Sequence, residues 1–288
     1  TKADFYLKNG NAAYGYLEPE FKDGLNTLRQ WYGEGLMDKN VVKIADLDSN
    51  ILNSVTGASC VWAGSGIGKY LTAMKNKNSS FNLVPAPFPV INKGDRPKFG
   101  TKEKLLNVNN NAFITSNCKN IELAMRFLDY GYTDEGHMLF NFGIEGESYE
   151  IKNGNPVYTD LILHNSDGLS MSEIMKKYML SIFSGPFIQD ERYIDQYYRY
   201  RQQKDALNVW SKCDGDKNSI PIIYLTTEES DKISKIMNDV EKCADETIFK
   251  FIMGIEPMDK YDDFVRQLKQ MGIDEAIAIY DTAVKRAS

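Results

Sequence analysis

The C-terminal stretch 249–286 constrains the fold most, because glycines interrupt it at positions where helices are expected to end. Gly254 follows a long amphipathic segment, and Gly272 follows a second segment that starts at Asp259. Glycine adopts the left-handed conformation after a helix at little cost, and the last carbonyls of the helix are then satisfied. The stretch therefore predicts the end of a long helix, a helix from Asp259 to Gly272, and a final helix.

Helix starts are marked further upstream. Thr226 with Glu229 forms a capping-box pattern, Asn120 and Thr133 are N-cap residue types, and Pro19 suits a first helical turn. The helix after Pro19 carries apolar residues at spacings of four, three and four. The helix would be closed by Gly33 or by Gly35.

Three short apolar runs predict strands at 59–63, 81–85 and 111–115. Prolines at 85, 87 and 89 predict an extended connector after the second strand. Residues 150–225 are polar, tyrosine-rich and less regular. Short strands separated by helices indicate an α/β architecture with a large share of helix.

Charge and hydropathy exclude two classes of protein. The net charge of −6 over 288 residues argues against a nucleic-acid surface, which needs clustered lysine and arginine. No apolar run reaches the roughly 18 to 20 residues that cross a bilayer. The chain begins with Thr1 in place of methionine and lacks a signal peptide, so an internal cut is expected at that end.

Four cysteines lie far apart in the sequence without the spacing of a metal site. Cys60 and Cys118 stand in apolar runs and are expected to be small buried hydrophobic residues. Cys213 and Cys243 would be able to form a disulfide in an exported protein, but their spacing alone does not decide it. We predict no metal and no cofactor.

Templates for catalysis fail. The loop 64–68 resembles a phosphate loop, but a phosphate loop needs glycine where Ala63 stands and serine or threonine where Tyr70 stands. The loop suits a structural turn and a ligand contact about equally. The calcium-loop pattern that begins at Asp214 lacks the final glutamate, because Leu225 occupies that position.

Two further features bear on catalysis. Glu145 and Glu147 are two residues apart, so on a strand their side chains would lie on the same face. A glycoside hydrolase needs its two carboxylates on opposite sides of the scissile bond, which one strand can hardly provide. The chain has only two histidines, and His137 is expected at the surface. No catalytic residue is predicted.

Four segments in one order carry a family resemblance: 19–38, with its Glu34-Gly35-Leu36 turn; 121–136; 142–149, with Gly143-Ile144-Glu145-Gly146; and 249–286. Together they resemble the extracellular solute-binding proteins of carbohydrate ABC importers, in the lipoprotein group related to alginate-binding proteins. The resemblance spans almost the whole chain.

The resemblance implies a helix-rich type II periplasmic-binding-protein-like fold with two lobes and hinge crossings. Family members are longer, so the chain would be a C-terminal portion whose fold lacks its N-terminal part. By analogy, residues 1–86 and 148–288 would form the C-terminal lobe. Residues 87–147 would complete the N-terminal lobe.

The resemblance also implies a function. The protein would capture an extracellular carbohydrate, with an oligosaccharide as the expected ligand, between its lobes and deliver it to the permease. It would be an extracellular or periplasmic protein, held to the membrane only by a lipid anchor on the absent N-terminus. The expected ligand contacts are Trp62, Ser65, Phe142, Glu145 and Tyr149. A fragment of a carbohydrate-active enzyme and an interaction module without a small ligand remain alternatives.

Overall fold

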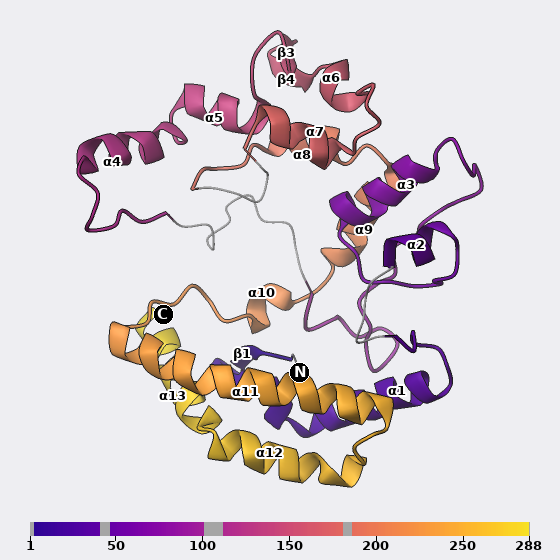
Figure 1. Ribbon diagram of the computed structural model, residues 1–288, viewed down its shortest axis with the longest axis vertical. Coiled ribbons are helices and arrows are strands. Elements are labelled where there is room, and N and C mark those ends of the chain that lie inside the picture. Colours follow the sequence, from indigo (N-terminus) through magenta and orange to yellow (C-terminus); the bar gives the residue numbers. More distant parts are fainter. Residues whose placement is uncertain (1–2, 41–46, 101–111, 181–185, 288) are drawn as a thin grey trace. The chain divides into compact units, whose positions relative to one another are not determined.

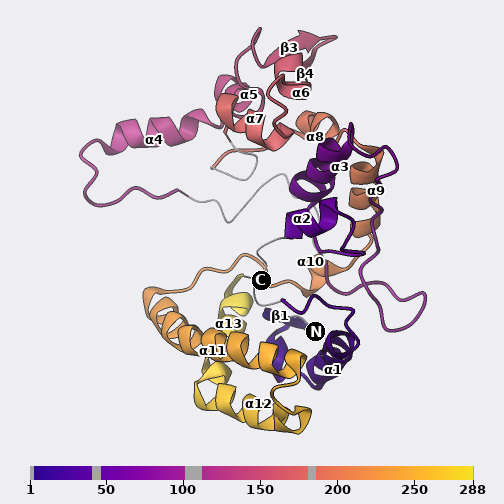
Figure 2. The same ribbon diagram turned by 45° about the vertical axis from the view of Figure 1, so that its right-hand side comes forward.

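The computed structural model describes residues 3–40, 47–100, 112–180 and 186–287. The chain divides into two compact units (Figures 1 and 2). Unit 1 comprises Thr1–Leu47, Phe88–Gly100 and Cys213–Ser288, and unit 2 comprises Asp48–Pro87 and Thr101–Lys212. The chain therefore passes from one unit to the other four times.

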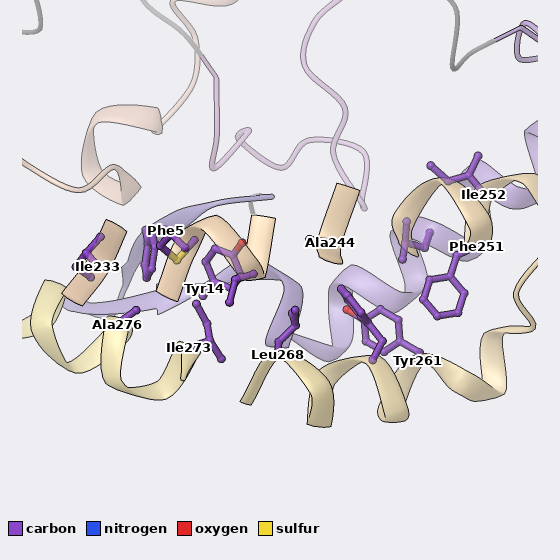
Figure 3. Packing of buried hydrophobic residues seen from close by; sticks show 14 residues of the cluster. Phe5, Tyr14, Ile233, Ala244, Phe251, Ile252, Tyr261, Leu268, Ile273 and Ala276 are labelled. Atoms are coloured by element: carbon purple, nitrogen blue, oxygen red, sulfur yellow. The ribbon is translucent and has the colours of Figure 1, made fainter. Parts of the chain in front are cut away.

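Unit 1 is a helical layer with one β-hairpin. Its elements are β1 (Phe5–Lys8), β2 (Asn11–Tyr14), η1 (Gly15–Leu17), α1 (Pro19–Gly33), α10 (Gly215–Asn218), α11 (Thr227–Met253), η3 (Met258–Lys260), α12 (Tyr261–Gln270) and α13 (Ile273–Ala287). The hairpin strands are antiparallel, with Phe5 opposite Tyr14. Side chains from the hairpin, α1, α11, α12 and α13 share one apolar core, part of which Figure 3 shows.

The predicted ends of α11 are confirmed. Thr226 and Glu229 make both hydrogen bonds of the capping box, and Gly254 ends the helix with φ of +78°. Arg286 of α13 donates to both carboxylate oxygens of Glu229, at 2.9 and 2.7 Å. These bonds, and one from the Thr226 amide, lower the pKa of Glu229 to about 2. At the other end, Arg29 donates to the carbonyls of Phe251 (3.0 Å) and Glu256 (2.7 Å). Local signals thus define where this helix starts and stops, and α1 and α13 hold its ends.

Unit 2 contains short helices and one hairpin. Its elements are α2 (Leu47–Leu52), η2 (Ala63–Gly68), α3 (Lys69–Met74), α4 (Ile121–Tyr130), α5 (Asp134–Phe142), β3 (Tyr149–Lys152), β4 (Asn155–Tyr158), α6 (Asp160–Leu163), α7 (Met171–Tyr178), α8 (Glu191–Tyr197) and α9 (Arg201–Trp210). Leu47 is the last residue of unit 1, so α2 begins at the boundary. The main core of unit 2 is rich in tyrosine and methionine, which explains why residues 150–200 lacked an aliphatic pattern.

The predicted caps Asn120 and Thr133 are confirmed, since their side chains accept hydrogen bonds from the amides of Leu123 and Gly136. The strand predictions are wrong where they can be compared. Residues 59–62 and 81–85 form no ladder, and residue 63 begins the π-helical turn η2. Of the third predicted strand, residue 111 lies outside the described residues and 112–115 are unpaired. A β-type composition forms a strand only beside a partner strand, and no partner lies along these runs in the described part of the chain.

Two expectations about cysteines also change. Cys60 is exposed and Cys118 is partly exposed, because the runs that contain them are not buried strands. Cys213 is the buried cysteine of the four, and it and Cys243 are free thiols.

The chain changes unit after residues 47, 87, 100 and 212, so one boundary lies one residue from the predicted division at 86 and none lies at 147. Phe142 shares a core with Tyr149, Tyr158 and Tyr193, so the end of the segment 87–147 packs with part of 148–288. Both of these parts belong to unit 2, and so does segment 48–86. Which segments form which lobe of a whole receptor stays a prediction.

Candidate functional site

Trp62 stands at the start of the glycine-rich turn η2. Its backbone is extended, with φ of −79° and ψ of 151°, and its carbonyl accepts hydrogen bonds from the amides of Gly66 (3.0 Å) and Ile67 (3.1 Å). Ala63, Gly66 and Ile67 are buried, whereas Ser65 is exposed and Trp62 is 64% exposed. Most of the turn is therefore packed against the interior of the unit, whereas the indole ring of Trp62 lies in solvent.

The glycines of η2 are needed because side chains crowd their α-carbons. A Cβ on Gly64 would lie 2.4 Å from Oη of Tyr197, and one on Gly68 would lie 2.5 Å from Nε2 of Gln203. Gln203 also donates to the carbonyl of Ala63 at 2.8 Å. Helices α8 and α9 thus hold the turn in place, and its shape is imposed by packing.

Glu145 and Tyr149 lie in the turn that follows α5. Ser148 fixes this turn, since its Oγ accepts from the Ile144 amide at 2.7 Å and donates to the Phe142 carbonyl at 2.7 Å. Glu145 is exposed and forms an isolated backbone bridge with Tyr149. Burial, followed by the charge of Glu145, raises the pKa of Tyr149. The turn presents a carboxylate beside a largely buried phenol.

Phe142 does not reach the surface. Its side chain has 0% exposure, and its ring lies 5.8 Å from that of Tyr149 and 5.5 Å from that of Tyr158. The predicted ligand role of Phe142 is therefore replaced by a role in the core. Phe142 is the last residue of α5, and its ring faces the core, a direction that the sequence alone did not reveal.

The two groups of candidate residues border the same core. Ala63, next to Trp62, belongs to the buried cluster that contains Phe142 and Tyr149. Trp62 and Ser65 are thus anchored at one part of that cluster, and Glu145 and Tyr149 at another. The members of each pair are close in the sequence, and both pairs border one buried cluster.

Sequence reasoning missed a small polar pocket beside η2. The pocket has a volume of about 20 Å³, room for roughly one water molecule. Its polar side chains include two cations and five hydroxyl groups: Lys69, Arg199, Thr72, Ser170, Ser172, Tyr197 and Tyr200. The hydroxyls of Thr72 and Tyr200 lie 3.1 Å apart. The only sequence signal was the tyrosine-rich and arginine-rich run 197–201, which has no fixed spacing.

Sequence reasoning also missed the partner of His137. The histidine side chain is 28% exposed, and its Nε2 lies 2.9 Å from Oδ2 of Asp190, a carboxylate with 7% exposure, so the histidine is part of a polar network. Arg192 donates to the same carboxylate through Nε at 2.9 and 3.1 Å. Burial alone would raise the pKa of Asp190, but the bonds from Arg192 and His137 outweigh burial and bring it to about 2. The network ties α5 to the start of α8.

The arrangement suits noncovalent binding. Among the residues that the structure describes, no three His, Cys, Asp or Glu side chains are placed to hold a metal ion. Glu145 and Glu147 lie in one exposed turn and not on a strand, so they do not face each other across a space for a glycosidic bond. An exposed indole with polar groups nearby can bind the apolar face of a ring and its hydroxyls. None of the described helices has the length and apolar character to span a bilayer.

Solved structures share this fold. The alginate-binding protein AlgQ2, crystallised without calcium ion, matches with a TM-score of 0.78 and 26% identity, over 99% of this chain and 58% of that protein. FusA, an ABC-transporter substrate-binding protein of S. pneumoniae solved with kestose, matches with a TM-score of 0.68 and 19% identity, over 98% and 57%. A solute-binding protein from Bifidobacterium longum infantis, described as binding HMO, matches with a TM-score of 0.67 and 15% identity, over 99% and 58%.

Two curated proteins are similar to the chain in sequence. Lipoprotein LipO of Bacillus subtilis is 23% identical over 278 residues, which are 93% of this chain and 52% of LipO. An uncharacterized protein in the butB 5′ region of Niallia circulans is 24% identical over 261 residues, which are 86% of this chain and 93% of that protein. No protein-family model matches the chain. The chain spans about half the length of LipO and of the solved relatives, and the expected helix-rich solute-binding fold is confirmed.

Proposed function

We propose that this chain, which has the fold of the sugar-binding proteins of ABC importers, belongs to a receptor that captures an extracellular carbohydrate for a membrane permease. The observation that carries the proposal is the match to AlgQ2 over 99% of the chain with a TM-score of 0.78. A carbohydrate is common to the solved relatives: one is an alginate-binding protein, one was solved with kestose, and one is described as binding HMO. An oligosaccharide is the ligand we favour.

Trp62 is the residue that we assign to ring stacking. Sugars present apolar C–H faces together with many hydroxyl groups, so their sites combine aromatic platforms with a few fixed polar groups. An exposed indole on a turn that packs against α8 and α9 supplies such a platform at a low entropy cost of ordering a loop. Ser65 and Glu145 are exposed polar residues near the same core, to which Ala63, the neighbour of Trp62, and Tyr149 belong. Tyr149 forms a backbone bridge with Glu145 and so helps to orient the turn that carries it.

The receptor would bind its ligand without changing it. A glycoside hydrolase needs an acid and a second carboxylate on opposite sides of the scissile bond. The candidate carboxylates Glu145 and Glu147 share a single turn. Release of the ligand to the permease would follow from opening of the two lobes, since binding favours the closed arrangement by the contacts that only it makes.

The location and partners follow from the same proposal. The protein would act outside the cytoplasmic membrane, on the cell surface or in the periplasm, and a lipid anchor like that implied by the name of LipO would keep it near the permease. The assignment of 1–86 and 148–288 to one lobe and of 87–147 to the other is part of this proposal.

Thermal unfolding of the whole gene product with a panel of oligosaccharides tests the proposal. A ligand that binds only the folded protein raises Tm in proportion to the logarithm of its concentration over Kd. Titration calorimetry with the best sugar then compares Trp62→Ala with Trp31→Ala. Trp31 is the control because it is also exposed, at 46%, but lies on α1 in unit 1.

Loss of stacking is worth about 0.5–1.5 kcal/mol beyond the loss of buried area, so Trp62→Ala should raise Kd by about threefold to more than tenfold. Trp31→Ala should leave Kd unchanged. Equal affinities of wild type and Trp62→Ala would remove Trp62 from the site. Hydrolysis of the sugar during the titration, seen by chromatography, would instead support an enzyme.

A further inference from the structure

The small polar pocket beside η2 lies entirely within unit 2. Gly64 and Gly68 of η2 line it, so the pocket adjoins the turn that begins directly after Trp62. Helices α3 and α9 lie side by side at this place (Figures 1 and 2), and the start of α7 lines the pocket as well. The described residues that line it include no carboxylate. Its volume of about 20 Å³ has room for one group the size of a water molecule.

The hydrogen bond between Thr72 and Tyr200 has a defined direction. A hydroxyl group has one proton to donate. Thr72 donates its proton to the carbonyl of Gly68 at 2.7 Å. The hydroxyl oxygens of Thr72 and Tyr200 lie 3.1 Å apart, so the proton between them comes from Tyr200. The phenol oxygen of Tyr200 therefore offers only lone pairs to a further partner, and it accepts in the pocket without donating.

Ser172 is an acceptor for the same reason. Ser170 donates its proton to Oε2 of Glu173 at 2.5 Å, within the capping box of α7. The oxygens of Ser170 and Ser172 lie 3.1 Å apart, so Ser172 supplies the proton between them. Ser172 then offers only lone pairs to a further partner. The pocket thus has one acceptor at the start of α7 and another at the start of α9.

Two exposed cations supply the donors of the pocket. Lys69 contacts the carboxylate of Asp48. Arg199 instead donates to the neutral carbonyl of Leu163, and its guanidinium carbon lies 6.0 Å from the centre of the Tyr200 ring. A guanidinium has five N–H groups, so Arg199 has further donors for a group in the pocket. We therefore assign the donor role to Arg199.

A group that fits this pocket must both donate and accept a hydrogen bond. A carboxylate or a sulfate has no proton for the two acceptors, and an ammonium group would face two cations. A hydroxyl group does both and is as small as a water molecule. We infer that the pocket is a subsite for one uncharged hydroxyl group of the carbohydrate, whose proton Tyr200 accepts and to whose oxygen Arg199 donates. The inference rests on the proposed function and adds a hydroxyl contact to the stacking on Trp62.

The test uses the whole gene product and the sugar that raises Tm most in a panel with kestose, maltotriose and an alginate trisaccharide. Tyr200→Phe removes the accepting oxygen and keeps the ring. Loss of this hydrogen bond should raise Kd by about twofold to tenfold in titration calorimetry. Tyr224→Phe is the matched control, because Tyr224 is 81% exposed and belongs to unit 1. This control should leave Kd unchanged.

Deoxy analogues of the same sugar, each without one hydroxyl group, identify the group that enters the pocket. One analogue should bind the wild type about tenfold more weakly than the parent sugar, because it leaves Tyr200 and Arg199 without their partner. In Tyr200→Phe the penalty for this analogue should shrink by about threefold, since one of the two hydrogen bonds is already lost. The penalties for the other analogues should be the same in both proteins.

Two results would overturn the inference and leave the proposed function intact. The first is an equal Kd for wild type and Tyr200→Phe, which would mean that water and not the sugar fills the pocket. The second is a loss of affinity in Tyr200→Phe that is the same for every deoxy analogue, which would mean that Tyr200 only supports the turn η2. A wild-type protein that no sugar of the panel stabilises would overturn the proposed function and this inference with it.

Discussion

Asp190 is a nearly buried carboxylate that stays charged because of its neighbours. Arg192 and His137 contact its oxygens, and the Arg192 amide donates to it at 2.8 Å as the first turn of α8 begins. An isolated buried charge would be costly, but a charge paired in this way supports the elements around it. The pKa of Asp190 falls from the ordinary 3.8 to about 2 as a result.

Replacing this charge should reduce stability in a pH-dependent way. Asp190→Asn keeps the cap of α8 but loses the charged bonds, at a cost on the order of 2 kcal/mol at pH 7. The folded-state pKa is depressed, so the charged form stabilises the fold above about pH 4, and this contribution is lost as the pH falls towards 2. The difference in unfolding free energy between wild type and variant should therefore shrink over that interval, as denaturant titrations would show.

Asp160→Asn is the matched control for this prediction. Asp160 also contacts a histidine, His164, at 2.9 Å, but its side chain is 90% exposed. An exposed pair of this kind contributes little, typically under about 1 kcal/mol. Equal effects of the two variants at pH 7 would contradict the role assigned to burial.

At the level of elements, glycine has two opposite uses in unit 1. Gly254 has φ of +78° and ends α11, and a Cβ there would meet Arg29 no closer than 3.6 Å. Gly24 lies in the middle of α1, and a Cβ there would meet nothing within 4 Å. Both positions have room for a methyl group, so the effect of alanine on stability reflects the backbone conformation and not a steric clash.

We therefore expect opposite signs from the same change. Gly254→Ala should destabilise the protein by about 1 kcal/mol, because an alanine in the left-handed region is strained. Gly24→Ala should stabilise it by about 0.5–1 kcal/mol, because alanine favours the helix interior. Urea titrations of both variants measure the effects. A stabilising Gly254→Ala would contradict the left-handed end of α11.

These elements also show what the sequence could predict. The caps at Asn120, Thr133 and Thr226 and the end at Gly254 depend on residues within one turn, and all four were predicted. The strand predicted at 59–63 is absent from the structure. Strand formation depends on pairing with a distant segment, which local composition does not reveal. The same limit applies to the site. The glycine turn beside Trp62 was visible in the sequence, but the inward direction of Phe142 and the pairing of His137 with Asp190 depend on packing.

At the scale of the whole molecule, each unit has its own hydrophobic core. The cluster of unit 1 gathers side chains from β1 to α13, and the main cluster of unit 2 gathers those from Ala63 to Tyr198. Domains with separate cores need not unfold in one step. The chain nevertheless passes between the units four times, which ties their folding together through the backbone.

Leu268→Ala tests how far damage to one core spreads. Leu268 is fully buried in unit 1, so its truncation should cost about 2–5 kcal/mol. Hydrogen exchange should accelerate in α11, α12 and α13 and stay unchanged in α7 and α8 of unit 2. Gln270→Ala, an exposed change on the same helix, is the control. Uniform acceleration across both units would show that they unfold as a single cooperative body.

The crowding around η2 has a practical consequence for changing what the protein recognises. Val61, Tyr197 and Gln203 occupy the space that a Cβ on Gly66, Gly64 or Gly68 would need. Side chains placed at these glycines would therefore force their neighbours to shift. Trp62 and Ser65 are exposed residues of the same segment, so substitutions there do not require these neighbours to move. A library restricted to these two positions would sample new ligand preferences while the scaffold beneath them stays intact.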